Sequence, residues 1–249
     1  IAREFSGIVV AEVRQVTQHP DADKLRICSV FDGEHEQQVV CGAPNVVSGM
    51  KTPFAMVGAK IETGESKPLE IIKAKLCGVE SHGMLCSAEE LGLEESSDGL
   101  MELPSDAPAG QDFRDYLQLS DSMIQLDLTP NRGDCLGMRG IAREVGVLSR
   151  KEVCEPDFNV VQPVHTEEFS IIIRAPEVCP RYLGRVIRNV KLNASSPLWM
   201  QEKLRRSGLR SVDPIVDVTN FVLMELGQPM HAFDYEKLSG KICVRMAND

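Results

Sequence analysis

The sequence lacks any apolar run near the roughly 20 residues that a membrane-spanning helix needs, and no basic-then-apolar secretory segment opens it. We therefore expect a cytoplasmic protein with no membrane partner. Aromatic residues make up only 5% of the chain, so no base-stacking platform is visible in the sequence.

The eight cysteines include no C-x-x-C pair, which excludes the ligand spacing of a zinc ribbon. Cys77, His82 and Cys86 lie five and four residues apart, but no second ligand pair is nearby. We expect reduced structural thiols and no bound metal. The cysteines stand at positions 28, 41, 77, 86, 135, 154, 179 and 243.

Positive charge is scarce in the first part of the chain. Residues 1–112 contain 9 Lys+Arg against 19 Asp+Glu, which gives −10, whereas residues 113–249 contain 18 of each. Neutralisation of phosphate by Lys and Arg supplies most non-specific RNA affinity. Any RNA binding by the first part should therefore be weak and sensitive to salt. The 249 residues are enough for two separate cores.

Short runs rich in Val and Ile fill the first part of the chain. They lie at 8–10, 25–30, 39–40 and 54–57, separated by turn residues such as Asp-Gly at 32–33. This pattern predicts a small β barrel with a further strand at 69–75. Ser87 as N-cap and Gly92 as stop signal predict a short helix between them.

Helix and strand signals mix in the second part, which predicts an α+β domain. Ser-Pro at 196–197 opens a helix that ends at Gly208, and Asp-Pro at 213–214 opens another that ends at Gly227. A third helix, capped by Asp134, carries an apolar stripe at 141, 145 and 148. Strands are expected at 169–174, 182–190 and 242–246, and a linker at 155–168.

Two pairs of cations are candidates for phosphate contact. Lys24 and Arg26 lie two residues apart on an expected strand, as do Lys73 and Lys75, so each pair shares one face. Spacing alone favours an ordinary solvated strand face. Asn45 and Ser87 are candidates for hydrogen bonds to RNA, although Asn45 has the alternative of building its own turn after a proline.

Seven segments carry a family resemblance: HPDADKL (19–25), CGAPN (41–45), KAKLCGVESHGMLCS (73–87), DLTPNRGDCL (127–136), CPRYLGR (179–185), DVTN (217–220) and QPMHAFD (228–234). Together they resemble the β subunit of bacterial phenylalanyl-tRNA synthetase over nearly the whole chain. One departure is Cys77, where that family usually carries Arg.

The resemblance implies a multidomain β and α+β protein. Residues 1–112 would form a tRNA-binding OB-type β barrel, 113–155 a small α+β packing segment, and 156–249 the truncated N-terminal part of the B3/B4 editing domain. Because residue 1 is Ile and the last expected strand has no visible partner, we expect a fragment of a longer subunit.

The same resemblance places Thr219, Asn220, Pro229 and His231 around an editing pocket that hydrolyses tyrosine wrongly esterified to tRNA(Phe). An apolar pocket rejects an added hydroxyl only weakly, so a second sieve improves fidelity. The glutamate that reads the phenol hydroxyl would lie beyond residue 249. His231 could act as a base or only position water, and a lone His is more often structural.

The resemblance also implies tRNA(Phe) and an α subunit as partners, in an (αβ)2 heterotetramer. ATP and Mg²⁺ would bind on the α subunit, and no cofactor on this fragment. The alternative is a non-enzymatic tRNA-binding or assembly module whose barrel is structural. Residues 181–210 hold eight Lys+Arg against Glu202, which suits either the tRNA acceptor end or the C-terminus of a helix.

Overall fold

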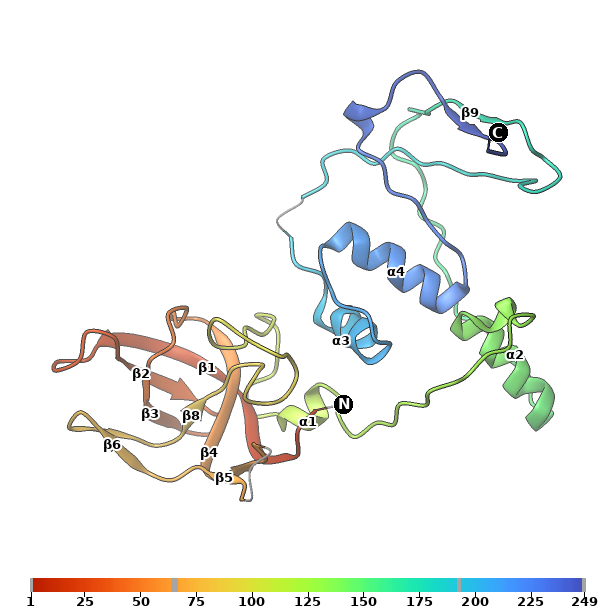
Figure 1. Ribbon diagram of the computed structural model, residues 1–249. Helices are drawn as coiled ribbons and strands as arrows, with labels where there is room; N and C mark the ends of the chain where they lie inside the picture. The colour runs from red at the N-terminus through yellow and green to blue at the C-terminus, as the bar shows by residue number, and fades with distance from the viewer. Residues whose placement is uncertain (1, 64–66, 192–193, 248–249) are drawn as a thin grey trace. The chain divides into compact units, whose positions relative to one another are not determined.

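The computed structural model describes residues 2–63, 67–191 and 194–247. The chain divides into two compact units, Ile1–Gln125 and Leu126–Asp249 (Figure 1). In the described ranges no helix is both long and apolar enough to cross a membrane.

The first unit is built on one antiparallel sheet, in the order β3-β2-β1-β4-β5 with β8 also paired to β4. A separate hairpin joins β6 (Ala74–Leu76) to β7 (Val79–Ser81). The sheet strands are β1 (Phe5–Gln18), β2 (Arg26–Phe31), β3 (Glu36–Cys41), β4 (Lys51–Ile61), β5 (Leu69–Glu70) and β8 (Met84–Leu85).

The core of this unit forms because alternate residues of the long strands face inward. Val13, Val30, Val39 and Phe54 are each 0% exposed and belong to one apolar cluster. The register of β1 against β2 shifts between Val13 and Gln15, which bends the strand. The sequence-based prediction of β structure in this region is confirmed.

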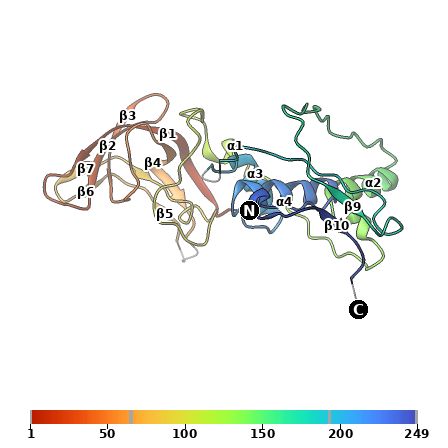
Figure 2. The ribbon, with the colours of Figure 1, turned by 90° about the horizontal axis from the view of Figure 1, so that it is seen from above.

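The sheet curls, but no ladder joins β3 to β8 within the described ranges. Hydrogen bonds from residues 80–82 bridge that side instead. The amide of His82 donates to the Gln38 carbonyl at 2.8 Å, and the Ser81 hydroxyl accepts from the Val40 amide at 3.0 Å. Figure 2 shows the strands of this unit from above.

The predicted helix at 87–92 is wrong, because the segment is a single turn. Ser87 and Glu90 exchange backbone-to-side-chain hydrogen bonds, as in a helix N-terminus. Leu91 and Leu93 are both buried, and Gly92 between them has φ +67°, so the chain leaves the helical path. The expected strand at 69–75 is likewise interrupted between β5 and β6.

Helix α1 (Phe113–Tyr116) packs on the sheet of the first unit. The Phe113 ring is 0% exposed and stacks on Phe5, with ring centroids 6.2 Å apart. The Asp112 carboxylate caps the helix by accepting from the amides of Arg114 and Asp115. A helix well beyond the last strand of the sheet therefore contributes to the core of this unit.

Gly83 is one of the positions where the first unit has no room for a side chain. A Cβ there would lie 2.4 Å from the Phe54 ring, and the backbone has φ +133°. We expect Gly83→Ala to lower the free energy of unfolding by about 2 kcal/mol through overpacking and backbone strain. Hydrogen exchange of β1 and β4 is the measurement.

Gly78→Ala is the matched control for Gly83→Ala. Gly78 has φ +90° but nothing within 4 Å of its Cβ position, so the substitution adds strain without a clash. Its expected cost is about 1 kcal/mol. An equal cost at the two positions would contradict the argument from the Phe54 contact.

The second unit contains three helices and a short parallel strand pair in the described ranges. Two 3-10 turns, Gly133–Cys135 and Tyr235–Lys237, complete these elements. The main elements are α2 (Met138–Ser149), β9 (Ile171–Ile173), α3 (Leu198–Arg206), α4 (Pro214–Leu226) and β10 (Ile242–Val244).

The helix α4 begins and ends where the sequence predicts. The Asp213 carboxylate accepts from the amides of Ile215 and Val216, and Gly227 closes the helix with φ +72°. α3 is confirmed too, although its N-cap position is Pro197 and no side chain caps it.

Two predictions for the second unit are wrong. Asp134 does not cap α2, because its carboxylate pairs with Arg132 at 3.0 Å and Gly137 is the N-cap. Residues 182–190 form no strand. Arg188 in that segment is held by Glu167 and lies 4.2 Å from the centroid of the Tyr235 ring, so side-chain contacts fix an irregular backbone.

Candidate functional site

The loop at 19–25 is held by side chains on either side of it. The Gln18 amide donates to the carbonyls of Ala22, Asp23 and Leu25. The Arg26 guanidinium donates to the Asp23 and Leu25 carbonyls at 3.0 and 3.2 Å. Arg26 is therefore partly engaged within the protein, at the start of β2.

Three of the four candidate cations are exposed and Arg26 is half-buried, and they do not lie in pairs on strand faces as the sequence predicted. Lys24 lies in the turn before β2, and Lys73 precedes β6. Lys75 lies within β6 and is exposed, as are Lys24 and Lys73. Beyond β6, Cys77 has φ +46°, so the tip of the β6–β7 hairpin has a left-handed backbone at this residue.

Asn45 and Ser87 already have internal partners. The Asn45 amide donates to the Leu100 carbonyl at 3.0 Å and accepts from the Leu100 amide at 2.9 Å. The Ser87 hydroxyl donates to Glu90 and accepts from the Glu90 amide. These bonds fix two loops of the first unit.

In the second unit, a buried carboxylate organises the start of α4. Asp217 is 0% exposed and accepts from the Ser196 and Ser211 hydroxyls at 2.5 Å each and from the Val212 amide at 3.0 Å. Burial alone would raise the pKa of this carboxyl. The three hydrogen bonds outweigh burial, so the pKa lies below its ordinary value of 3.8.

The predicted editing residues occupy two stretches of the second unit. Thr219 and Asn220 lie on α4, two and three residues beyond Asp217, and the Thr219 hydroxyl donates to the Val216 carbonyl at 2.8 Å. Pro229 and His231 are exposed and follow the end of α4. In the described ranges no hydrogen bond or ring contact joins His231 to Thr219 or Asn220.

His231 lies in an aromatic row that sequence reasoning missed. Its ring lies between Tyr182 and Phe233, with centroids 6.5 and 6.2 Å away and interplanar angles of 21° and 22°. The Tyr182 hydroxyl lies 3.5 Å from His231 Nδ1. CPRYLGR carried the resemblance, but nothing in that motif indicated a contact with the distant histidine.

The basic window at 181–210 is partly neutralised within the protein. Arg205 and Arg206 pair with Glu202 at 2.8 and 3.2 Å, and only 11% of the Glu202 side chain is exposed. Lys203 Nζ lies 5.6 Å from the centroid of the Trp199 ring. Lys203, Arg205 and Arg206 also lie in the last turn of α3, where the structural interpretation of these cations expects them.

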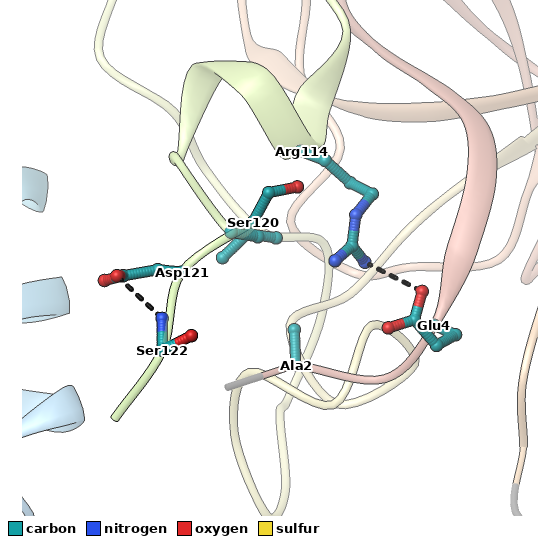
Figure 3. A pocket seen from close by; sticks show the side chains of 7 residues that line it. Ala2, Glu4, Arg114, Ser120, Asp121 and Ser122 are labelled. Atoms are coloured by element: carbon teal, nitrogen blue, oxygen red, sulfur yellow. Dashed lines mark hydrogen bonds and ion pairs between the residues drawn. The ribbon is translucent and has the colours of Figure 1, made fainter. Parts of the chain in front are cut away.

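An open, polar pocket of about 420 Å³ lies near α1 (Figure 3). Arg114 lies 3.8 Å from Glu4 there, and 5.0 Å from the centroid of the Phe5 ring. It contains none of the residues predicted as sites. Its lining residues are Ala2, Glu4, Arg114, Leu119, Ser120, Asp121 and Ser122.

Side chains that could bind a metal ion are not clustered in the part of the chain that the structure describes. No group of three or more His, Cys, Asp or Glu side chains is placed to hold a metal ion there. The described residues therefore do not fit a Mg²⁺ site.

Two protein families match this chain, one in each compact unit. A tRNA binding domain family matches residues 8–112, and the B3/4 domain family matches residues 178–249. The phenylalanine-tRNA ligase beta subunit of Pseudomonas syringae pv. syringae (strain B728a) is 59% identical over 245 residues, covering 98% of this chain and 30% of that protein.

Other proteins with the same name have similar sequence identity to this chain and similar coverage. Those of Hahella chejuensis and Shewanella oneidensis are 58% and 57% identical, cover 99% and 100% of this chain, and are each covered to 31%. Among solved structures, a MetRS-related protein from Pyrococcus horikoshii aligns with 25% identity and a TM-score of 0.32, over 42% of this chain and 86% of its own.

A tRNA binding domain and a B3/4 domain in one chain define a subunit of the aminoacyl-tRNA ligase class. The chain belongs to the family of phenylalanine-tRNA ligase beta subunits, and it spans about a third of the length of the relatives that it matches.

Proposed function

We propose that this chain supplies tRNA binding and part of an editing site to a phenylalanine-tRNA ligase. The observation that carries the proposal is the presence of both family matches in one chain that is 56–59% identical to these beta subunits. The proposed domains are an OB-type barrel at 1–112, a packing segment at 113–155 and the beginning of the editing domain at 156–249.

Two features of the first unit support the proposal of a barrel: its curled antiparallel sheet and the hydrogen bonds between residues 80–82 and β3. In this proposal Lys24, Arg26, Lys73 and Lys75 contact tRNA phosphates. Asn45 and Ser87 contribute to the same surface, and because they also fix loops, their substitution would affect folding as well as binding.

In the second unit, Thr219, Asn220, Pro229 and His231 line part of a pocket for hydrolysis of Tyr-tRNA(Phe). Water adds to the ester carbonyl, the ester bond breaks, and tyrosine and tRNA with a free terminal hydroxyl are released. His231 is exposed and able to accept a proton from that water or hold it in place. The Tyr182 hydroxyl limits the orientations of its ring.

The whole enzyme proposed here joins phenylalanine to tRNA(Phe) with ATP and Mg²⁺, in an (αβ)2 assembly. In this proposal, ATP and Mg²⁺ bind on the α partner. We place the assembly in the cytoplasm.

Binding of tRNA by this chain should depend on salt through the exposed lysines. We expect the double variant Lys73→Ala, Lys75→Ala to have a shallower dependence of log affinity on log salt concentration, by the equivalent of about 2 phosphate contacts. The reason is that binding releases about one counterion for each phosphate that a lysine neutralises. Fluorescence anisotropy of labelled tRNA over a salt series is the measurement.

The double arginine variant, Lys73→Arg with Lys75→Arg, is the control because it retains both charges. Its slope should match that of the wild type. An unchanged slope in the alanine variant would exclude phosphate contact by these lysines. Undetectable binding by the wild type even at low salt would favour a structural role for the barrel, in line with its acidic composition.

A further inference from the structure

His19 is buried in the first unit, although it lies in a loop at the end of β1. It is only 2% exposed, and its two ring nitrogens have different partners. The Asp21 amide donates to Nδ1 at 3.1 Å, within the same loop. Nε2 lies 3.3 Å from the carbonyl oxygen of Leu76, 57 residues along the chain.

These partners fix the protonation of the ring. A backbone amide only donates, so Nδ1 must carry a lone pair, and a carbonyl only accepts, so Nε2 must carry the proton. His19 is therefore the neutral Nε2–H tautomer, and one ring donates and accepts at once. Loss of the ring would break both bonds.

The two bonds connect the segments that contain the candidate cations. Asp21 belongs to the loop before Lys24 and Arg26, and Leu76 ends the strand that contains Lys75. The β6–β7 hairpin is otherwise tied to β3 near its far end, where Gln38 donates to the Glu80 carbonyl at 2.8 Å. Figures 1 and 2 show the hairpin at the edge of this unit.

We propose that His19 is a positioning residue that holds the 19–25 loop and the β6–β7 hairpin together as one phosphate-binding surface. Without it, the hairpin tip moves independently, and the cations at 24 and 26 no longer act together with those at 73 and 75. This inference rests on the proposed tRNA binding, and it adds a role that the charges alone do not predict.

Two substitutions separate the two bonds of His19. His19→Asn retains a side-chain oxygen near the position of Nδ1 to accept from the Asp21 amide, but it is too short to reach Leu76. His19→Gln retains a donor near the position of Nε2. Comparing them tests the contact with the hairpin rather than the general stability of the loop.

The first measurement is hydrogen exchange at residues 76–79 in the whole chain. We expect about tenfold faster exchange in His19→Asn, because the hairpin tip opens locally more often, and near-wild-type exchange in His19→Gln. Unchanged exchange in His19→Asn would overturn the proposal, whether or not the chain binds tRNA.

The second measurement is tRNA affinity over a salt series, in a cycle with Lys73→Ala and Lys75→Ala. We expect His19→Asn to weaken tRNA binding about fivefold and to reduce the dependence of the affinity on salt. In the His19→Asn protein, the lysine substitutions should weaken binding little further. Additive effects would overturn the proposal, since a surface held together must show coupling. Absence of binding by the wild type would instead refute the proposed tRNA binding, and this surface with it.

Discussion

Asp217→Ala is expected to lower the free energy of unfolding of the second unit by about 3 kcal/mol, because each buried donor left without an acceptor costs about 1–3 kcal/mol. The carboxylate joins Ser196, before α3, to Ser211 and the Val212 amide, before α4. The substitution removes all three bonds at once. Trp199, the one tryptophan of the chain, reports unfolding near α3 by fluorescence.

Ser211→Ala and Asp157→Ala are the controls. Ser211→Ala removes one of the three bonds and should cost about 1 kcal/mol. Asp157 is exposed and in irregular structure, so its substitution should change stability by less than about 0.5 kcal/mol. A cost for Asp217→Ala no larger than that for Ser211→Ala would contradict the assigned role of the carboxylate.

The same carboxylate gives the second unit an acid-sensitive component of stability. Because its folded pKa lies below the ordinary value of 3.8, the stabilisation is fully present above pH 3.8 and is lost as the pH falls through the folded pKa. Asp217→Ala should therefore show a smaller loss of stability than the wild type over that acid range. Equal pH dependence in the two proteins would contradict this linkage.

Local signals predicted the elements whose ends depend on local contacts. Asp213 and Gly227 bound α4 because a capping carboxylate and a left-handed glycine act on neighbouring amides and carbonyls. The helix expected at 87–92 failed because burial of Leu91 and Leu93 overrides its capping signals. Tertiary packing, which cannot be read from a single sequence, therefore determines the backbone of this segment.

The candidate site was predictable in composition but not in contacts. Lys24, Lys73 and Lys75 are exposed as a phosphate-binding role requires, whereas the Asn45 amide is used by a backbone 55 residues away. Asp217 had a signal that could have been used: an acid between two valines in a mostly apolar helix needs buried partners. The sequence contains no such signal for His19, because its second partner is the backbone carbonyl of Leu76, a group that every residue has.

His231→Ala is expected to slow hydrolysis of Tyr-tRNA(Phe) by about 100-fold, because a positioned proton acceptor contributes about 10²–10⁴-fold to such reactions. Phenylalanylation of tRNA should be unchanged, since no step of that reaction is assigned to this histidine. His165→Ala is the matched control: it removes another histidine of the same unit that lies outside the proposed pocket, and hydrolysis should be retained.

The most direct test of the proposed editing site is therefore the release of tyrosine from Tyr-tRNA(Phe) by a complete phenylalanine-tRNA ligase that contains this segment, with the α partner present. We expect rapid release by the wild type and by His165→Ala, and a large loss in His231→Ala with phenylalanylation intact. Equal release by wild type and His231→Ala, or no release by the wild type, would contradict it.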